Sequence, residues 1–354
     1  GRKRFLRRAR GYVPTPIRII GLKEGLAVGG EQKNTICISR GEYAFLSQHL
    51  GTLKRDAVFN NYKFIIDHFK KLYNLTPSFV ACDLHPGYQS TNYAIQLADK
   101  SDIKKIEVQH HHSHIVSCMA ENELKNIQVI GLAFDGTGMG TDGNIWGGEF
   151  LICDYNKFRR MGHLKYVEMP GGDKAVKEPW RMALSYLYRM DYDKSYIKNI
   201  LRDRFELNEE KVEIVLDMLQ KDFNSPLTSS MGRLFDAVAA LIGLRKKITY
   251  QAQAAIELEA VADVNVKERY HYLIEKEDDK FIVNTNILIK DILSDSKNGI
   301  SDSIISAKFH NTIVDFSLSM CKLIREKVAI NRVVLSGGVF QNEILLESIY
   351  EKLK

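Results

Sequence analysis

Short apolar runs rich in β-branched residues, each followed by a turn rich in Gly, Asp or Ser, occur four times in this chain. Buried strands that end in such turns are how α/β sheets present ligands at their carboxyl ends. The pattern therefore predicts an α/β protein that binds ligands in these turns. The four units are residues 25–30, which lead through 33–35 into 36–39; 79–82 with 83–86; 129–134 with 135–140; and 332–335 with 336–338.

Helical stretches, with apolar residues three and four positions apart, lie between these strands. The predicted helices are 59–73, 110–123, 180–188, 211–221, 233–241 and 307–328. Strand–turn units near 25–39 and 129–152 each predict a β-hairpin that opens a lobe. We expect an N-terminal lobe of 1–125 and a C-terminal lobe of 126–354 with a helical insertion at about 170–250. By analogy, two such lobes are similar to the actin/sugar-kinase-like (ASKHA) nucleotide-binding folds. The charged stretch 275–297 has the least regular pattern and is expected to be a peripheral insertion.

Composition narrows the class of protein. The chain has 354 residues, 45% of them hydrophobic and 27% charged, which suits a globular protein with two lobes of ordinary size. No apolar run approaches the roughly 18 residues of a membrane span, and the basic residues 1–10 lack the apolar core of a signal peptide. We expect no membrane association. Because the chain does not begin with Met, we expect a fragment or a processed product.

Charge and cysteine usage add two further expectations. The formal net charge is +6, but six of the first ten residues are Arg or Lys, so the remainder is near neutral. No basic face interleaved with aromatic residues follows, so we expect no nucleic-acid partner. The five cysteines are scattered singly without a CxxC pair, which argues against a disulfide framework or a cysteine zinc site and fits the cytoplasm. They are Cys37, Cys82, Cys118, Cys153 and Cys321.

Four of the chain's ten histidines lie within five residues, at His110, His111, His112 and His114. The cluster follows an expected strand at 106–109 and opens a helix. His110 and His114 then lie one turn apart on one face, while His111 and His112 point elsewhere. Imidazoles at i and i+4 can bind one metal ion, although two ligands do not complete a site. The alternative is a polar helix start with structural histidines.

Two glycine-rich turns are candidate ligand loops. In the first, Asp135 is followed by Gly136, Thr137, Gly138 and Gly140; its glycines can bring backbone N–H groups to a phosphate, and Asp135 can bind a metal or a hydroxyl. It is neither a Walker loop nor a GxGxxG motif, and a plain hairpin turn is the alternative. In the second, Gly337 and Gly338 follow an apolar strand, and Asn342 can cap the next helix or bind a ligand. A plain strand-to-helix turn is equally compatible with it.

In a fourth segment, residues 169–181, side chains of opposite charge lie close together in sequence around a Gly-Gly turn. The charged residues are Asp173, Lys174, Glu178 and Arg181, and Pro179 fits the first turn of a helix. A surface ion-pair network is the commoner origin of such a cluster. The sequence contains no serine-hydrolase elbow and no local signature of a cysteine nucleophile.

Taken in order, these segments resemble the C-terminal half of HypF, the hydrogenase-maturation carbamoyltransferase family. The resemblance covers almost the whole chain, and its longest motifs are the histidine cluster, PGGDKxxxEPWR and TSSMGRLFDAVAAL. The matching segments are residues 7–14, 33–35, 47–49, 82–86, 90–91, 109–114, 134–149, 170–181, 228–236, 253–259 and 336–342.

The resemblance implies a fold like that of TsaD, the universal tRNA threonylcarbamoyl-adenosine transferase. It implies a divalent metal, iron or zinc or else magnesium, on His110 and His114, with Asp135 as a further ligand. It also implies that ATP or AMP, as carbamoyl-adenylate, is bound by a set of glycines and polar side chains. These are Gly136, Thr137, Gly138, Gly140, Asp236, Gln253, Gly337, Gly338 and Asn342.

The implied reaction moves the carbamoyl group of carbamoyl-adenylate to the C-terminal cysteine thiol of HypE, in the biosynthesis of the cyanide ligands of [NiFe]-hydrogenase. The catalytic residues would be His110, His114, Asp135, Lys174, Glu178 and Arg181. AMP is a good leaving group and the attacking thiolate belongs to HypE, so the chain needs no strong nucleophile of its own. A separate domain would form the carbamoyl-adenylate.

This chain departs from the family pattern in three places. The usual Tyr-Glu-Gly-Gln-Ala reads Tyr-Gln-Ala-Gln-Ala at 250–254, and the usual Ser-Gln-His-Ile-Gly-Asp-Leu-Glu loses two acids at 47–54. The family's last Asp-Gly-Gly segment, whose Asp should ligate the metal, would follow Lys354. Two other functions are compatible with the sequence: an O-carbamoyltransferase acting on a small molecule, and a degenerate nucleotide-binding scaffold.

Overall fold

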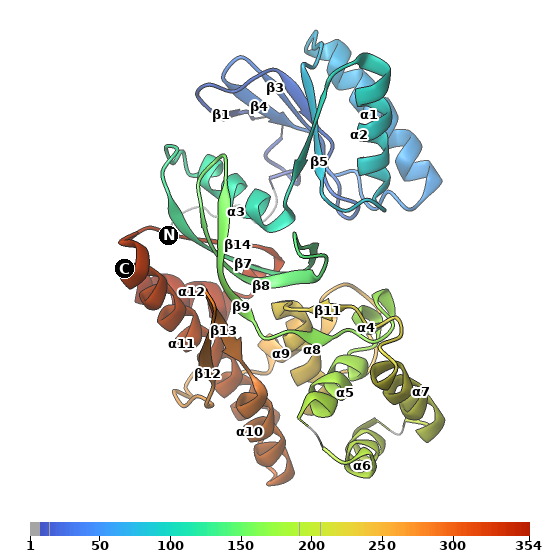
Figure 1. Ribbon diagram of the computed structural model, residues 1–354, viewed down its shortest axis with the longest axis vertical. Helices are drawn as coiled ribbons and strands as arrows, with labels where there is room; N and C mark the ends of the chain where they lie inside the picture. The colour runs from blue at the N-terminus through green and yellow to red at the C-terminus, as the bar shows by residue number, and fades with distance from the viewer. Residues whose placement is uncertain (1–7, 14, 191, 206) are drawn as a thin grey trace. The chain divides into compact units, whose positions relative to one another are not determined.

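The computed structural model describes residues 8–13, 15–190, 192–205 and 207–354. The chain divides into two compact units, Gly1–Asn126 and Ile127–Lys354. Each unit contains its own sheet with helices (Figure 1). The Arg7 and Pro14 ends of the family-like segment 7–14 lie outside the described residues.

The first unit contains a six-stranded mixed sheet and three helices. Its strands lie in the order β1 (Ile17–Arg18), β4 (Tyr43–Leu46), β3 (Cys37–Arg40), β2 (Gly25–Ala27), β5 (Phe79–Asp83) and β6 (Lys104–Val108). Strands β2 and β3 form the antiparallel hairpin predicted near 25–39, and β5 and β6 pair in parallel. The helices are α1 (Asp56–Leu72), α2 (Gln89–Ser101) and α3 (His110–Glu121). Buried Tyr62, Ile66 and Ala94 of α1 and α2 join the sheet in one core.

The second unit contains an eight-stranded sheet whose longest strand is β7 (Val129–Met139). β7 pairs antiparallel with β8 (Ile145–Cys153), as the predicted hairpin requires, and in parallel with β14 (Val333–Ser336). Beyond β8 lie β9 (Phe158–Leu164), β13 (Lys280–Asn284) and β12 (Leu273–Glu277). The short β10 (Val167–Glu168) and β11 (Leu227–Thr228) join at the Ile145 end of β8.

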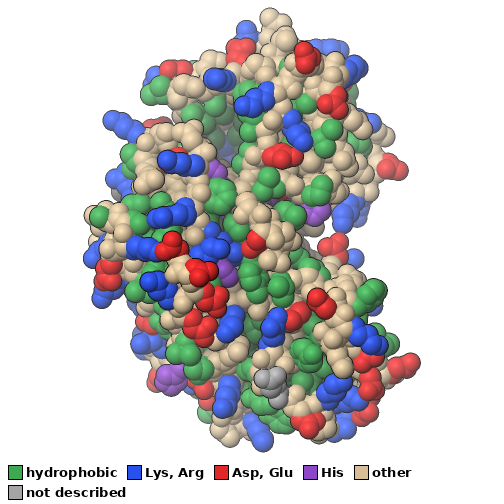
Figure 2. All heavy atoms as spheres, in the orientation of Figure 1, with side chains coloured by type: hydrophobic (Ala, Val, Ile, Leu, Met, Phe, Trp, Pro, Cys, Tyr) green, Lys and Arg blue, Asp and Glu red, His purple; other side chains and the backbone are tan. Residues whose placement is uncertain are grey.

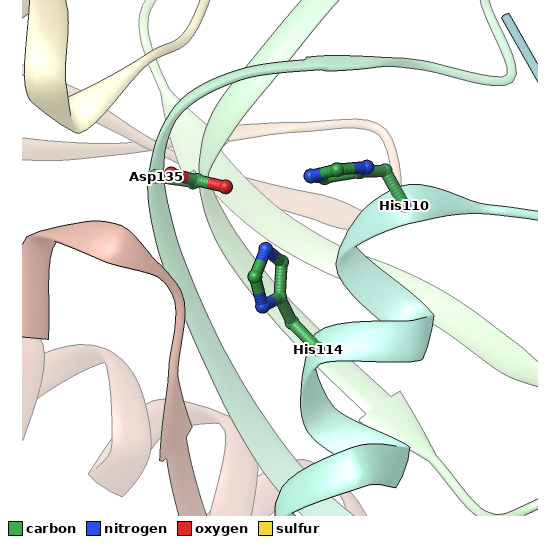
Figure 3. A group of neighbouring side chains, drawn as sticks. All are labelled: His110, His114 and Asp135. Carbon is green, nitrogen blue, oxygen red and sulfur yellow. The ribbon is translucent and has the colours of Figure 1, made fainter. Parts of the chain in front are cut away.

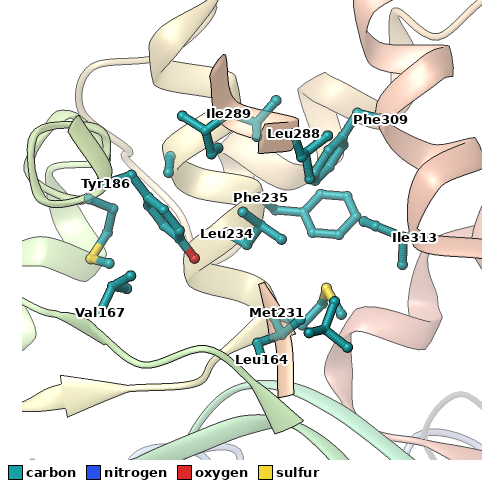
Figure 4. Close-up of a cluster of buried hydrophobic side chains, with 14 of the residues drawn as sticks. Leu164, Val167, Tyr186, Met231, Leu234, Phe235, Leu288, Ile289, Phe309 and Ile313 are labelled. Carbon is teal, nitrogen blue, oxygen red and sulfur yellow. The ribbon is translucent and has the colours of Figure 1, made fainter. Parts of the chain in front are cut away.

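Helix α8 (Met231–Leu241) is buried along its whole length, as its almost uninterrupted apolar sequence requires. Leu234 and Phe235 of α8 lie in the core with Tyr186 and Phe309 (Figure 4), and the rings of Phe235 and Phe309 are 4.9 Å apart between centroids. The other helices are α4 (Asp173–Lys177), α5 (Trp180–Arg189), α6 (Lys194–Phe205), α7 (Glu209–Gln220), α9 (Gln253–Ala260), α10 (Asn286–Lys297), α11 (Asp302–Val328), the 3-10 turn η1 (Gly338–Gln341) and α12 (Glu343–Leu353).

The prediction of a peripheral insertion at 275–297 was wrong. This stretch supplies most of the β12–β13 hairpin and helix α10, and β13 pairs in parallel with β9 inside the main sheet. Ile282 and Val283 of β13 and Leu288 of α10 are buried. Charged residues interrupt the apolar pattern of this stretch in the sequence, and they lie mainly in the exposed hairpin turn and on the solvent face of α10.

Helices capable of spanning a membrane do not occur among the described residues, since none is both long and apolar enough. On the face shown in Figure 2, basic and acidic side chains intermix over both units.

Ala252, where the HypF pattern has Gly, adopts a left-handed conformation with φ +63° just before α9. In that conformation the Cβ of an L-residue crowds the following carbonyl, at a cost of roughly 1–2 kcal/mol that glycine avoids. The replacement of glycine by Ala252 therefore strains the backbone locally at the start of α9.

Ala252→Gly should raise the free energy of unfolding by about 0.5–1 kcal/mol, since relief of the strain exceeds the added chain entropy. Ala255→Gly, inside α9, should lower it by about 1 kcal/mol. Urea denaturation of both variants measures the two changes. Destabilisation by Ala252→Gly would contradict the strain argument.

Candidate functional site

The histidine cluster begins helix α3, as the sequence predicted. Gln109 caps the helix, because its side-chain oxygen accepts the N–H of His112 at 2.8 Å. His110 and His114 project from the same side of α3 (Figure 3), and a ligand nitrogen of each lies within 4.8 Å of the other. His111, in contrast, is fully buried and contacts the Gln109 amide at 3.1 Å. The outer pair thus has the spacing of two ligands to one ion.

Asp83, at the end of β5, contacts His110. Its Oδ2 lies 2.7 Å from His110 Nδ1, and its Oδ1 accepts the N–H of His85 at 3.0 Å. Burial opposes ionisation of Asp83, but the hydrogen bond and charge of His110 outweigh it and lower the pKa of this carboxyl. With the Nδ1 proton held by Asp83, Nε2 of His110 is the acceptor nitrogen, which is the state a metal ligand needs. Sequence reasoning missed this role, although Asp83 follows a predicted strand within a family-like motif.

In the second unit, the segment from Asp135 to Gly140 is not the loop that the sequence predicted. Strand β7 continues to Met139, and its register against β8 jumps from Phe134–Gly148 to Gly138–Trp146. Three residues of β7, Asp135 to Thr137, therefore stand opposite Gly147 alone. A Cβ on Gly147 would lie 2.5 Å from the Asp135 carbonyl oxygen, so the strands approach too closely for any other residue. Asp135, Gly136 and Thr137 form a β-bulge within the sheet.

The second glycine turn lies beside this bulge, because β14 runs parallel to β7. The N–H of Gly338 donates to Asp135 Oδ1 at 3.3 Å. Gly337 has φ +108°, and a Cβ there would lie 2.3 Å from the Phe134 carbonyl oxygen, so this position requires glycine. Two segments about 200 residues apart in sequence, which the motif analysis treated separately, thus meet at one edge of the sheet.

The N-terminus of α8 is the third element at this edge. Ser230 caps α8, and its hydroxyl lies 2.8 Å from the Asp135 carbonyl oxygen and 2.7 Å from that of Gly136. A Cβ on Gly232 would lie 2.9 Å from Gly136 Cα. The first turn of α8 is therefore in direct contact with the bulge, and its positive end is directed there.

Asp236, one of the nucleotide-binding residues that the resemblance implies, lies on α8 and is only 1% exposed. Its Oδ2 is 2.8 Å from Arg233 Nη2. Burial raises the pKa of Asp236 to about 6, against the opposing charge of Arg233. Contact with a nucleotide stays a prediction for this residue.

Gln253 and Asn342 have their amides engaged within the protein. The Gln253 oxygen accepts the N–H of Thr249 at 2.8 Å, and its nitrogen donates to Glu257 at 2.9 Å. Asn342 caps α12, and its nitrogen lies 2.9 Å from His310 Nε2. Capping, one of the two roles foreseen for Asn342, is therefore present, and nucleotide contact stays a prediction for both.

The charged segment at 169–181 forms a local structure around its Gly-Gly turn. Arg181 is buried, and its Nε lies 2.6 Å from Glu178 Oε2. Its guanidinium also contacts the Pro170 carbonyl oxygen at 3.4 Å, which holds the turn in place. Asp173 and Lys174 are exposed. Of the predicted glycine-segment residues, Thr137 is exposed and Gly140 packs against Trp146.

A buried ion pair between Glu149 and Arg160 lies next to the bulge. It was not predicted from the sequence. Glu149 Oε2 lies 2.6 Å from Arg160 Nε, and Glu149 Oε1 accepts the N–H groups of Gly147 and Gly148 at 3.0 and 3.2 Å. Ser229 donates to the same carboxylate oxygen at 2.6 Å. The ion pair thereby joins β8, β9 and the residues that lead into α8.

Comparison with known proteins assigns both units to one family. Residues 22–121 match the model described as the HypF Kae1-like domain, and residues 131–354 match "Carbamoyltransferase, Kae1-like Domain, second subdomain". The chain belongs to the HypF carbamoyltransferase family. The predicted α/β class and TsaD-like relationship are confirmed, with one sheet in each unit.

Individual HypF proteins are similar over the whole chain. Carbamoyltransferase HypF of Synechocystis is 38% identical over 100% of this chain and 47% of its own length. The probable HypF of Methanocaldococcus jannaschii is 35% identical over 99% and 45%. The crystal structure of full-length HypF in the phosphate- and nucleotide-bound form superposes with a TM-score of 0.90 and 46% identity, over 97% of this chain and 53% of that one. The chain therefore spans about half the length of these relatives.

Two buried histidines should make this HypF-family chain sensitive to acid. Burial lowers the pKa of His310 to about 4, and burial and the charge of Arg160 lower that of His163 to about 4. The unfolded chain, with His near pKa 6.5, then binds more protons between pH 4 and 6.5. The free energy of unfolding should fall as pH is lowered through this window, by about 1.4 kcal/mol per pH unit for each histidine. Urea denaturation of His163→Gln and His310→Gln should show a shallower pH slope than the wild type; equal slopes would contradict it.

Proposed function

We propose that this chain is the carbamoyl-transfer part of a cytoplasmic HypF enzyme, and that it moves the carbamoyl group of carbamoyl-adenylate to the C-terminal cysteine of HypE. The product would then serve cyanide-ligand synthesis for [NiFe]-hydrogenase. Carbamoyl-adenylate would come from a separate adenylate-forming domain. Membership of the HypF family supports the reaction class, and the state of the chain's own cysteines supports an acceptor thiol from outside.

All five cysteine thiols of the chain are free and poorly ionised. Burial raises the pKa of Cys37, Cys153 and Cys321 to about 12, and it also raises the pKa of Cys82 and Cys118. Thiolates, not thiols, attack acyl carbons. At neutral pH the chain therefore offers no thiolate of its own, which favours direct transfer to a partner's thiolate.

The α3 histidines fit a divalent metal. Imidazole nitrogens suit iron and zinc, and the Asp83–His110 contact is the carboxylate support usual for a metal-bound histidine. We propose His110 and His114 as ligands and Asp135 of the second unit as the third. The metal, when bound, would neutralise negative charge on the reacting group.

The second unit would hold the adenylate. Gly136 in the bulge, Gly138 just after it, and Gly337 and Gly338 carry no side chain that would keep a phosphate from the backbone, and the α8 N-terminus adds positive potential. The N–H groups of Gly136 and Gly338 donate to Asp135 Oδ1, so a phosphate would compete with this carboxylate for them. Asp236 would contact the ribose hydroxyls. The turn held by Arg181 would order the acceptor tail. In the reaction, the HypE thiolate attacks the carbamoyl carbon, the new C–S bond forms, and the bond to AMP breaks with its electron pair leaving on AMP.

His110→Ala and His114→Ala should each abolish bound metal, because each removes one of the two nitrogens on the α3 face. Asp83→Asn should weaken metal binding by about 10–100-fold, the usual effect of removing such a supporting carboxylate. His111→Ala, which changes a buried ring outside this face, should keep most of the metal. Elemental analysis and metal titration measure all four. Equal losses in all four variants would refute the assignment of the outer pair.

Incubation with ready-made carbamoyl-adenylate and HypE should give a carbamoyl adduct on the last cysteine of HypE. The rate should rise with pH as the acceptor thiol ionises, near pKa 8.5 unless the site lowers it. Mass spectrometry of HypE measures the adduct, and a HypE variant lacking that cysteine is the control. Transfer only to a small hydroxylated acceptor would favour an O-carbamoyltransferase, and no transfer from folded, metal-loaded protein would favour a degenerate scaffold.

A further inference from the structure

Arg233 and Asp236 of α8 are buried without complete hydrogen bonding. Arg233 is 6% exposed and Asp236 1%. Although Arg233 Nη2 lies 2.8 Å from Asp236 Oδ2, this oxygen and the Nε and Nη1 atoms of Arg233 have no hydrogen-bond partner with suitable alignment. A guanidinium carries five donors in a rigid fork. Buried polar groups are nearly always satisfied, so an arginine in this state points to a ligand.

The guanidinium lies beside the bulge of β7. A Cβ on Gly136 would lie 3.8 Å from Arg233 Nη2, and a Cβ on Gly232 would lie 2.9 Å from Gly136 Cα. Arg233 is the third residue of α8, directly after the capped N-terminus at Ser230. An arginine fork, the positive end of a helix and a glycine backbone therefore occur together within the second unit, and all three favour an anion.

We propose that Arg233 binds a phosphate oxyanion at the β7 bulge and that Asp236 holds its guanidinium in position. This inference rests on the proposed function, in which the phosphate belongs to the adenylate. The orphaned Nε and Nη1 donors lie on different edges of the guanidinium, while Nη2 is paired with Asp236. Either orphaned donor can give a charge-assisted hydrogen bond to a phosphate oxygen. Inorganic phosphate has the same chemistry, and the experiment separates the two sources.

The test is calorimetric titration of the folded chain with AMP, adenosine and inorganic phosphate. Wild-type protein should bind AMP more tightly than adenosine. Arg233→Gln should weaken AMP binding by about 10–100-fold, the scale of lost hydrogen bonds to a charged group. It should weaken adenosine binding much less, since adenosine has no phosphate and is affected only by the disturbance of Asp236. Arg233→Lys, which keeps the charge without the fork, should retain part of the AMP affinity. Arg189→Gln is the matched control, because Arg189 pairs with Glu168 instead.

The outcomes separate this inference from the proposed function. Equal loss of AMP and adenosine affinity, or no loss of either, would overturn the role of Arg233 while leaving the nucleotide site in place. Phosphate binding that Arg233→Gln abolishes, in a protein that never binds adenosine, would support the oxyanion site and remove the nucleotide function. A wild type that binds neither AMP nor phosphate would overturn both. If Arg233→Gln does not fold, the AMP-to-adenosine affinity ratio of Arg233→Lys decides: a reduced ratio supports the role and an unchanged ratio overturns it.

Discussion

The ion pair between Glu149 and Arg160 is the interaction on which the edge formed by the β7 bulge, the turn after β14 and the α8 N-terminus depends. Glu149 is fully buried, and its carboxylate binds backbone N–H groups, a serine hydroxyl and a guanidinium at once. A buried charge is tolerated when all of its hydrogen-bonding positions have partners, as they do here. Removal of one partner from a buried ion pair costs about 3–5 kcal/mol of stability. Arg160 also stacks on Trp146, 4.0 Å from the ring, so the tip of the β7–β8 hairpin is held by the same group.

Next to this ion pair, three backbone segments meet without side chains between them. Gly147, Gly232 and Gly337 have no room for a Cβ, so strand β7, helix α8 and the turn after β14 approach one another as closely as chains can. Close approach places the Asp135 carboxylate and the α8 N-terminus at one edge. The polar side chains around it are mostly engaged with the protein. Arg233 pairs with Asp236, but its Nε and Nη1 donors have no partner, and they are the reason to expect a phosphate there.

The first unit positions its functional groups differently. A parallel β5–β6 pair ends next to α3, so Asp83 meets His110 across 27 residues of sequence. The helical spacing aligns His110 with His114, while the carboxylate sets which nitrogen of His110 carries the proton. Two features therefore position these histidines: the i, i+4 spacing within α3, and the contact of His110 with Asp83 from another segment.

The sequence by itself determined the α/β class, the two hairpins, six of the helices, the i and i+4 histidine pair and the family. These features depend on local periodicity or on motifs that can be read one segment at a time. Only the tertiary structure decided that residues 275–297 belong to the sheet, that Asp135 lies in a bulge, and that Asp83, Glu149 and Arg160 support the sites. Each of these depends on contacts between segments far apart in the chain, and the spacing of residues within one segment does not report which other segment it will meet.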